Sequence, residues 1–415
     1  MYICSKQQDK YSYIPARERW SLYKSVWQNH WIDFLQIYDT KFLSPYGNIS
    51  QRKMDEVQKL IECGNFLNGF QKYTCKDCGI SLVVPFTCKS RLCLSCNRKK
   101  LFSWSSNLSY ILNTDFQHIH VTFTIPTILA NLLLHKGYPV EKMISIAVGV
   151  YKREFLKSAK IPEFSKRDWH LGVLATVHKC GNSLNYNPHV HLVGTKELIN
   201  IKTGEILENT FISFKSFHFT WMRTFCKHLM KQKILTESEY LQILEKYKNG
   251  FHVYIQPIHG NHNEVLFRIA EYIASGFFHN SQILKVLHQD KKVIFRYKSW
   301  VDRNTGEKSF QVITMDIYEF MAKMLFFLPE PNTKMIRYYG IYAQSLSQRL
   351  GVMERVAWAK AIEHSFNTKP NFCPDCKRQM ELKVVYSNSS FNEITKMKAS
   401  QDLINGYFKP RSRSP

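Results

Sequence analysis

Six of the eleven cysteines fall within residues 63–96, and this cluster constrains the fold more than any other feature of the chain. The segment has too little apolar mass to fold without a cross-link. It contains two CxxC pairs, CKDC and CLSC, which 14 residues separate. Each pair can form a tight turn that presents two thiolates to one ion, and two such turns complete a tetrahedral site. We therefore predict a structural Zn²⁺ that is bound by Cys75, Cys78, Cys93 and Cys96.

The other clustered cysteines leave alternatives open. Cys63 and Cys88 either extend the cluster to a second metal, exchange with one of its ligands, or are simply buried. A third pair, CPDC, contributes Cys373 and Cys376 near the C-terminus. One CxxC pair cannot fill a zinc site alone. The pair can therefore form a further zinc site only if other residues complete it. The candidate partners are Cys63 and Cys88, or His364; the alternative is that the pair has no partners and binds no metal.

Charge narrows the class of partner. Lys and Arg total 57 against 33 for Asp and Glu, which gives a net charge of +24. A surplus of this size favours a nucleic-acid partner, because phosphate contacts release counterions and dominate affinity. The basic residues that we predict to contact DNA beside the cysteines are Arg91, Arg98, Lys99 and Lys100. The alternative is a zinc module that acts only as a structural staple.

The chain has no features that predict secretion or a membrane. No stretch reaches the roughly 18 consecutive apolar residues that span a bilayer. The first residues, MYICSKQQDKYSYIPARERW, are polar and aromatic rather than a charged start followed by an apolar run. The expected location is the cytoplasm, with no membrane partner. Cysteines in such a chain are expected to ligate metals rather than to form disulfides.

A histidine pair in HVHLVG, at 189–194, suggests a second metal site. On a strand, His189 and His191 point to the same face about 6.6 Å apart, so both imidazoles can reach one divalent ion. The preceding predicted strand ends in His178, which can lie beside the pair across a hairpin and supply a third ligand. The alternating segment 118–124 also gathers histidine and threonine on one face. A structural role for the pair is the alternative.

The segment NEVLFRIAEYIASG, at 263–276, predicts a helix that carries a nucleophile. Val265 and Ile269 lie on its apolar stripe, while Tyr272 stands off that face. Arg268 lies one turn earlier and is expected to bind a phosphate. A phenol that attacks phosphorus gives a covalent phosphotyrosine, which conserves the bond energy for rejoining. The alternative is packing, since the chain has 22 tyrosines.

The remaining periodicities predict an α+β fold in which an antiparallel sheet carries the histidine pair and the Tyr272 helix packs alongside. The chain before the cysteines is predicted to be helical. The other expected elements are helices within 18–60 and over 51–61, 139–158 and 215–248, strands at 118–126, 171–178 and 251–258, a turn at 44–47, a hairpin around DRNTGEK, and a helix that Asp316 caps and that runs to about residue 328.

These motifs, taken in order, resemble those of the rolling-circle HUH transposases of bacterial insertion sequences, which join an N-terminal zinc-binding domain to a tyrosine transposase domain. The resemblance runs from about residue 30 to residue 345. The stretches that carry it are CKDCGISLVVPFTCKSRLCLSCNRKK, HVTFTIP, LATVHKCGNSLNYNPHVHLVG, the AEYIA helix, and FRYKSW followed by IRYYGIYA.

The resemblance implies roles for individual residues. It makes His189 and His191 ligands of a catalytic Mg²⁺ or Mn²⁺, and His178 and His120 match further histidines, of which His178 is the proposed third ligand. It makes Tyr272 the nucleophile. The matching zinc cysteines are Cys75, Cys78, Cys93, Cys96, Cys63 and Cys88. Two departures stand out: Arg268 occupies the place of a second tyrosine in many relatives, which indicates the single-tyrosine branch, and Asn187 stands where relatives often have a third histidine.

The resemblance also implies an organisation and an activity. The expected domains are a helical region (1–60), a zinc-binding domain (61–105), an HUH catalytic domain (106–350), and a C-terminal region with the CxxC pair and a basic disordered tail (351–415). The expected activity is nicking and rejoining of single-stranded DNA at transposon ends and target DNA through a 5′-phosphotyrosine. The alternatives are a plasmid rolling-circle replication initiator or relaxase, and a zinc-dependent DNA-binding regulator without activity. The motifs specify neither the target sequence nor the oligomeric state.

Overall fold

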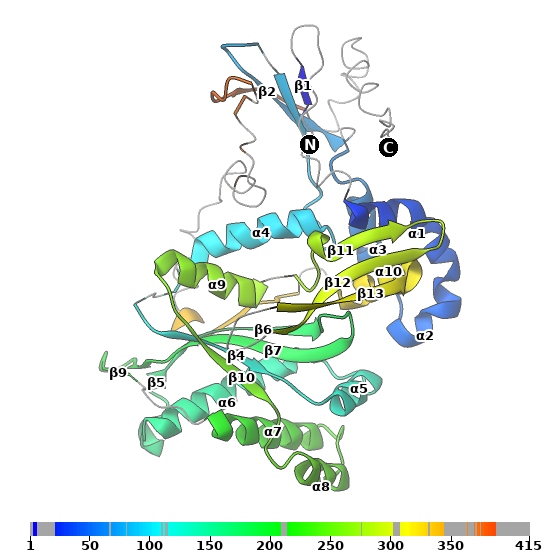
Figure 1. The fold of residues 1–415 in the computed structure, drawn as a ribbon. Helices are drawn as coiled ribbons and strands as arrows, with labels where there is room; N and C mark the ends of the chain where they lie inside the picture. The colour runs from blue at the N-terminus through cyan, green and yellow to red at the C-terminus, as the bar shows by residue number, and fades with distance from the viewer. Residues whose placement is uncertain are drawn as a thin grey trace.

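A computed structural model gives the fold of the chain as an assembly of antiparallel sheets and helices (Figure 1), which confirms the α+β class. None of the helices in the described part has the length and apolar character needed to cross a membrane. The structure describes residues 3–5, 21–65, 68–79, 81–108, 111–112, 115–208, 214–274, 276–301, 308–330, 333–343, 363, 369, 372–373 and 375–386.

The N-terminal region is helical, as expected. It consists of α1 (Leu22–Lys41), α2 (Leu43–Tyr46) and α3 (Gln51–Ile61). Ser21 and Ser50 begin α1 and α3 as N-caps, because their side chains accept hydrogen bonds from backbone N–H groups of the first turn. The expected turn at 44–47 is instead mostly the short helix α2, which ends at Gly47 with a φ of 74°.

A four-stranded sheet joins both ends of the described chain. Its strand order is β1-β3-β2-β15, with every pair antiparallel. The hairpin of β2 (Phe70–Thr74) and β3 (Ser81–Pro85) is flanked by β1 (Ile3–Ser5) on one side and β15 (Glu381–Tyr386) on the other. The helix α4 (Leu94–Asn107) follows the hairpin and precedes the strands of the central sheet.

The central sheet is antiparallel and has the strand order β10-β4-β7-β6-β14. Its strands are β10 (Val253–Ile258), β4 (His118–Phe123), β7 (Tyr186–Thr195), β6 (Gly172–Cys180) and β14 (Arg337–Gly340). The expected strands at 118–126, 171–178, 189–194 and 251–258 are therefore all present, and β6 and β7 form the predicted hairpin.

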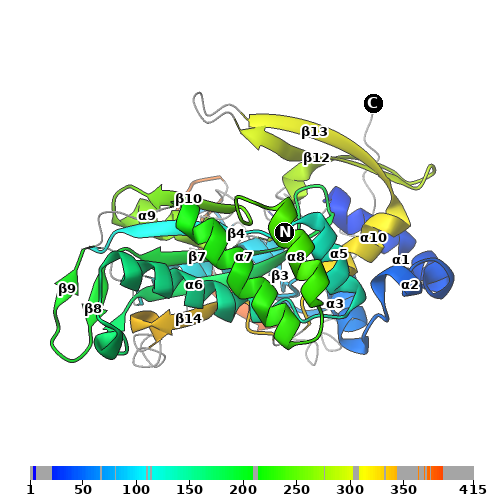
Figure 2. The same cartoon turned by 90° about the horizontal axis from the view of Figure 1, so that it is seen from below.

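Helices cover both faces of the central sheet. On one face α6 (Lys142–Ser158) and α7 (Phe214–Lys231) lie side by side (Figure 2), with α5 (Thr127–His135) and α8 (Glu237–Lys246) at their ends. On the other face α9 (His262–Ala274) contacts β6, β7 and β10 and packs against α4 (Figure 1). The helix that carries Tyr272 therefore lies over the sheet, as predicted.

The alternation expected of the segment 118–124 is confirmed by burial. Ile119, Val121 and Phe123 belong to the core between the sheet and the helices α5–α7. His118 and His120, on the opposite face, are also buried, at 2% and 4% exposed. The second face of the sheet is thus closed over by protein, and its polar side chains must find partners there.

The segment 215–248 is helical, as expected, but it forms two helices, because the chain turns between α7 and α8. The turn passes through Lys233, whose φ of 57° is left-handed. Thr236 and Glu239 then form a capping box that starts α8. The sequence carried this signal, since a threonine followed three residues later by glutamate marks a helix start.

Smaller elements complete the fold. The hairpin expected around DRNTGEK is present as β12 (Lys292–Val301) and β13 (Lys308–Asp316), and Asp316 caps the helix α10 (Ile317–Phe327) as predicted. The β12–β13 ribbon lies apart from the central sheet (Figure 2). These remaining elements are β5 (Trp169–His170), β8 (Leu198–Asn200), β9 (Ile206–Leu207), β11 (Ile283–Leu287), β12 (Lys292–Val301), β13 (Lys308–Asp316), α10 (Ile317–Phe327), and short 3₁₀ turns at Glu163–Ser165 and Asn280–Gln282.

The cap of α10 generates a stability prediction. An Asp316 oxygen accepts hydrogen bonds from the backbone N–H groups of Tyr318 at 2.9 Å and Glu319 at 3.1 Å. Asp316→Ala removes both and should lower the free energy of unfolding by about 1 kcal/mol. Asp316→Asn keeps an accepting oxygen and should change it by only a few tenths. Denaturant unfolding measures both variants, and an equal loss in the two would contradict the capping role.

Burial of His118 predicts a pH dependence of stability. Its Nε2 lies 2.6 Å from the Tyr342 hydroxyl, and burial lowers the pKa of His118 to about 4. Between that value and the ordinary 6.5, the unfolded chain binds a proton that the folded chain does not. The stabilisation that this group contributes is therefore fully present above about pH 6.5 and is lost as the pH falls toward 4.

The test compares urea unfolding at pH 7 and pH 5. The wild-type chain should lose more stability between these values than His118→Phe, by on the order of 1–2 kcal/mol. His135→Phe, which changes an exposed side chain at the end of α5, is the matched control and should behave like the wild type. If His118→Phe loses as much stability between pH 7 and pH 5 as the wild-type chain does, His118 does not make this contribution.

Candidate active site and metal centres

Three histidines meet on the face of the central sheet that α9 covers. His178 on β6 lies directly opposite His189 on β7, and His191 follows two residues later on the same face. One ring nitrogen from each lies within 4.8 Å of the others, which is close enough for a single ion to bind all three. The antiparallel pairing of β6 with β7 therefore brings the predicted third ligand to the pair.

Further hydrogen bonds fix the orientation of these rings. His189 Nδ1 lies 2.6 Å from the backbone oxygen of Asn187. His191 Nδ1 lies 2.8 Å from His120 Nε2, and the Thr122 hydroxyl is near both rings. Such outer partners hold ligating imidazoles in one orientation and leave the second nitrogen of each ring for the ion.

The three rings are electrically suited to bind a cation. Desolvation, followed by the neighbouring His189, lowers the pKa of His178 to about 3. Desolvation, followed by His178, also lowers the pKa of His191 well below its ordinary value. Imidazoles with such pKa values are neutral at pH 7, and the neutral ring is the form that ligates metals. Three neutral ligands would leave coordination positions on an ion open to oxygen atoms of water or phosphate, which Mg²⁺ and Mn²⁺ prefer.

Tyr272 lies against this cluster. Its ring stacks on His120 with the ring centroids 3.9 Å apart and the planes 9° apart. Its hydroxyl lies 3.4 Å from Gln256 Oε1. Val265 and Ile269 bury the apolar side of α9, while Tyr272 is only partly buried and Arg268 is exposed. The expected arrangement of apolar stripe, phenol and exposed guanidinium on one helix is therefore present.

Two residues at the site escaped the sequence analysis. Gln256 on β10 pairs with His120 on β4 and accepts from the Tyr272 hydroxyl. The hydroxyl of Tyr254, on the same face of β10, also lies 3.4 Å from Gln256 Oε1. The alternation within the predicted strand 251–258 placed Tyr254 and Gln256 on one face, and this signal could have identified them.

A four-cysteine cluster lies at the base of the β2–β3 hairpin. Cys63 follows α3, Cys88 follows β3, and Cys93 and Cys96 begin α4. The Cys96 sulfur lies 3.7 Å from that of Cys63 and 3.6 Å from that of Cys88, and the Cys93 sulfur lies 3.8 Å from that of Cys63. A tetrahedral zinc ion with Zn–S bonds of about 2.3 Å would hold sulfurs about 3.8 Å apart, so the cluster fits this metal.

The structure corrects the predicted grouping of the cysteines. Cys75 and Cys78 do not share a cluster with Cys93 and Cys96, but lie instead with Cys373 and Cys376. The reason is the hairpin itself, since CKDC forms its turn while CLSC follows its base, and a five-residue strand separates the two by roughly 15 Å. Cys63 and Cys88 were wrong as partners for CPDC, because they complete the other cluster, and the alternative partner His364 lies outside the described residues.

The predicted DNA-binding residues differ in their surroundings. Arg98 and Lys100 are exposed on α4, the helix that packs against α9. Lys99 donates to the Thr87 hydroxyl at 3.1 Å. The guanidinium of Arg91 instead donates to the backbone oxygen of Thr333 at 3.2 Å, so this side chain is turned into the protein.

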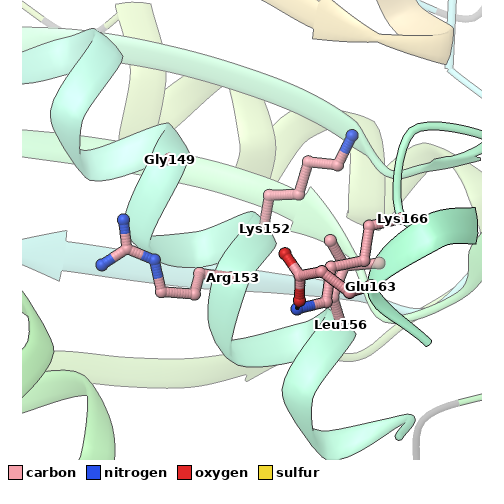
Figure 3. A pocket seen from close by; sticks show the side chains of 6 residues that line it. All are labelled: Gly149, Lys152, Arg153, Leu156, Glu163 and Lys166. Carbon is pink, nitrogen blue, oxygen red and sulfur yellow. Dashed lines mark hydrogen bonds and ion pairs between the residues drawn. The ribbon is translucent and has the colours of Figure 1, made fainter. Parts of the chain in front are cut away.

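A cavity of about 260 Å³ lies on the far side of the sheet, against α6 (Figure 3). Lys152 and Arg153 approach it from α6, and Glu163 and Lys166 approach it from the segment that follows. The cavity is basic but contains none of the histidines or cysteines described above. It is separated from them by the central sheet and adds nothing to the candidate active site.

Comparison with protein families agrees with this layout. The family described as "Transposase zinc-binding domain" matches residues 27–125, which include the first six clustered cysteines. The family described as "Putative transposase" matches residues 172–349, which include the three clustered histidines and α9. The two families occur in the order that the sequence motifs predicted.

Comparison with individual proteins gives the same result. The "Transposase for insertion sequence element IS801" of Pseudomonas savastanoi pv. phaseolicola is 23% identical over 317 residues, which are 72% of this chain and 72% of that protein. The "Putative transposase y4qJ" of Sinorhizobium fredii is 22% identical over 334 residues, which are 74% of this chain and 79% of that protein. No solved structure matches the chain at a significant level. With a zinc-binding domain followed by a transposase domain, the chain belongs to the IS91 family of insertion-sequence transposases.

Proposed function

We propose that this transposase nicks and rejoins single-stranded DNA at the ends of its insertion sequence, by rolling-circle transposition at the bacterial nucleoid. The proposal rests on the contact between the candidate nucleophile, Tyr272, and the histidines that are the candidate metal ligands. Tyr272 stacks on His120, and His120 is hydrogen-bonded to His191 of the three-histidine cluster. A phenol and a metal-binding site so close together suit attack on one phosphodiester group.

In this proposal His178, His189 and His191 hold a Mg²⁺ or Mn²⁺ ion. When bound, such an ion polarises a phosphodiester oxygen and orients the phosphate for in-line attack. The chain's own residues do the rest of the positioning. His120 supports the Tyr272 ring from the sheet side, and Gln256 accepts from its hydroxyl.

The proposed chemistry exchanges one phosphorus–oxygen bond for another. The Tyr272 oxygen attacks the scissile phosphorus and loses its proton, and a phosphotyrosine bond forms to the 5′ side of the break. The bond from phosphorus to the 3′ oxygen breaks, and that oxygen gains a proton to become a free 3′-hydroxyl. A 3′-hydroxyl of a second strand later attacks the phosphotyrosine, which joins the strands and restores the phenol.

Basic residues near the phenol are proposed to hold the DNA strand. Arg268 lies one helical turn before Tyr272 on α9 and is exposed, so it can bind a neighbouring phosphate. Arg98 and Lys100 are exposed on α4, which packs against α9. A strand that runs over both helices would contact these cations while its scissile phosphate reaches Tyr272.

The family membership bears on the two alternative functions. It favours an insertion-sequence transposase over a plasmid replication initiator or relaxase, which would use the same chemistry at an origin. A regulator without activity would need neither the Tyr272 stack nor neutral histidines that converge on one point. The covalent adduct separates enzyme from regulator directly, because only the enzyme forms it.

The proposed function predicts that this covalent adduct forms. Wild-type protein incubated with single-stranded element ends and Mg²⁺ or Mn²⁺ should form a species that survives denaturing gel electrophoresis. Tyr272→Phe removes the attacking oxygen and should abolish the adduct while DNA binding is retained. Tyr297→Phe is a matched control, since the Tyr297 hydroxyl also donates to a glutamine, Gln311, but on the separate β12–β13 ribbon.

Peptide mapping of the adduct decides the role of Tyr272. The DNA should be attached to the peptide that contains Tyr272. Attachment at Tyr254, whose hydroxyl shares the same glutamine acceptor, would overturn the assignment of the nucleophile but keep the reaction. Binding without an adduct in both wild type and variant would leave a regulator as the function.

The proposed function also predicts that adduct formation depends on the metal. Chelation of divalent ions, or substitution of His189→Ala or His191→Ala, should lower the rate of adduct formation. Substitutions of outer partners of a metal site typically cost about 10- to 100-fold, so loss of a ligand should cost at least about 100-fold. His135→Ala, which changes an exposed histidine on α5, should leave the rate unchanged. A rate that does not depend on added Mg²⁺ or Mn²⁺ would contradict the proposed site.

A further inference from the structure

We infer that Cys75, Cys78, Cys373 and Cys376 bind a second zinc ion, which clasps the C-terminal segment to the tip of the β2–β3 hairpin. The sulfur of Cys376 lies 3.5 Å from that of Cys75. The sulfur of Cys78 lies 3.3 Å from that of Cys373 and 3.7 Å from that of Cys376. These separations are close to the roughly 3.8 Å between ligands of tetrahedral zinc and far from the roughly 2.05 Å of a disulfide.

The two pairs have the same local backbone, although they lie some 300 residues apart in the sequence. The backbone N–H of Gly79 donates to the oxygen of Cys75 at 3.1 Å, and that of Lys377 donates to the oxygen of Cys373 at 3.0 Å. Both donors have left-handed backbones, with φ of 68° at Gly79 and 59° at Lys377. A lysine accepts such a strained φ only where a tight turn demands it, so CPDC is built as a second copy of the metal-binding turn in CKDC.

Other contacts hold the two segments in register without the metal. β15 pairs with β2 from Glu381 opposite Thr74 to Tyr386 opposite Phe70. Two ion pairs also bridge the segments, one between Asp77 and Arg378 at 2.6 Å and one between Lys76 and Glu381. The four thiols therefore face one another because the surrounding chain places them there, rather than by chance proximity.

The position of the cluster explains why a metal is needed. Cys75 and Cys373 are each 1% exposed, while Cys376 is exposed. None of these four cysteines belongs to the three hydrophobic core clusters found in the described part of the chain. A small sheet with little core of its own gains its stability from cross-links, and buried thiols that lack a core suit a structural zinc site.

The inference can be tested by counting zinc in the full-length protein. Native mass spectrometry of the chain in a His189→Ala, His191→Ala background, which disables the histidine cluster, should find about two tightly held zinc ions per chain. Adding Cys373→Ser and Cys376→Ser should reduce the count to about one. Cys226→Ser, which changes a buried thiol of α7 outside both clusters, is the matched control and should keep about two.

A conservative variant guards against a folding failure of the double substitution. Cys376→His offers a nitrogen ligand at the exposed position and should keep about two zinc ions. After zinc is replaced by cobalt, the visible absorption of the parent chain should be that of two sites with only sulfur ligands. The absorption of Cys376→His should be that of one sulfur-only site and one site with mixed sulfur and nitrogen ligands. The inference is overturned if the parent chain holds about one zinc, if the double substitution still holds about two, or if the parent mass shows disulfides among these cysteines.

Discussion

The architecture depends on the burial of a polar face of the central sheet beneath α9. Burying imidazoles without hydrogen bonds would cost several kcal/mol, so the bonds among the members of this face stabilise it. His191 bonds to His120, and His189 bonds to the backbone of Asn187. His120 also carries the stacked ring of Tyr272. The contacts that orient the candidate metal ligands therefore also dock the helix with the candidate nucleophile, and neither can shift alone.

The local parts of this site could be predicted because strand periodicity fixes them. A period of two placed His189 and His191 on one face, and a hairpin placed His178 opposite His189. The contact of Tyr272 with His120 and Gln256 could not be predicted in this way. It depends on how α9 crosses the sheet and on how β10 pairs with β4, two strands that lie over 100 residues apart in the sequence.

The cysteines show the same limit more sharply. Spacing identified each CxxC pair as a metal-binding turn, but it does not say which turns share an ion. CKDC and CLSC are the CxxC pairs nearest to each other in the sequence, but they lie at opposite ends of the β2–β3 hairpin. The true neighbour of CKDC is CPDC, which reaches it only because β15 adds to the edge of β2. A prediction from spacing assumes short connections, and a C-terminal strand that returns to an N-terminal hairpin breaks that assumption.

The two cysteine clusters differ in what surrounds them, and this difference bears on how the zinc region serves the proposed active site. Cys93 and Cys96 belong to a hydrophobic core that also contains Phe34 of α1, Phe278 after α9 and Phe320 of α10. The zinc region and the chain on either side of the β12–β13 ribbon thus share one core, and close-packed cores resist small displacements. With α4 also packed on α9, a DNA strand held by α4 would meet Tyr272 at a fixed distance. In the proposed function, the cluster that contains Cys93 and Cys96 therefore fixes the distance between α4 and Tyr272. The cluster that contains Cys75 and Cys373 shapes the tip of the β2–β3 hairpin.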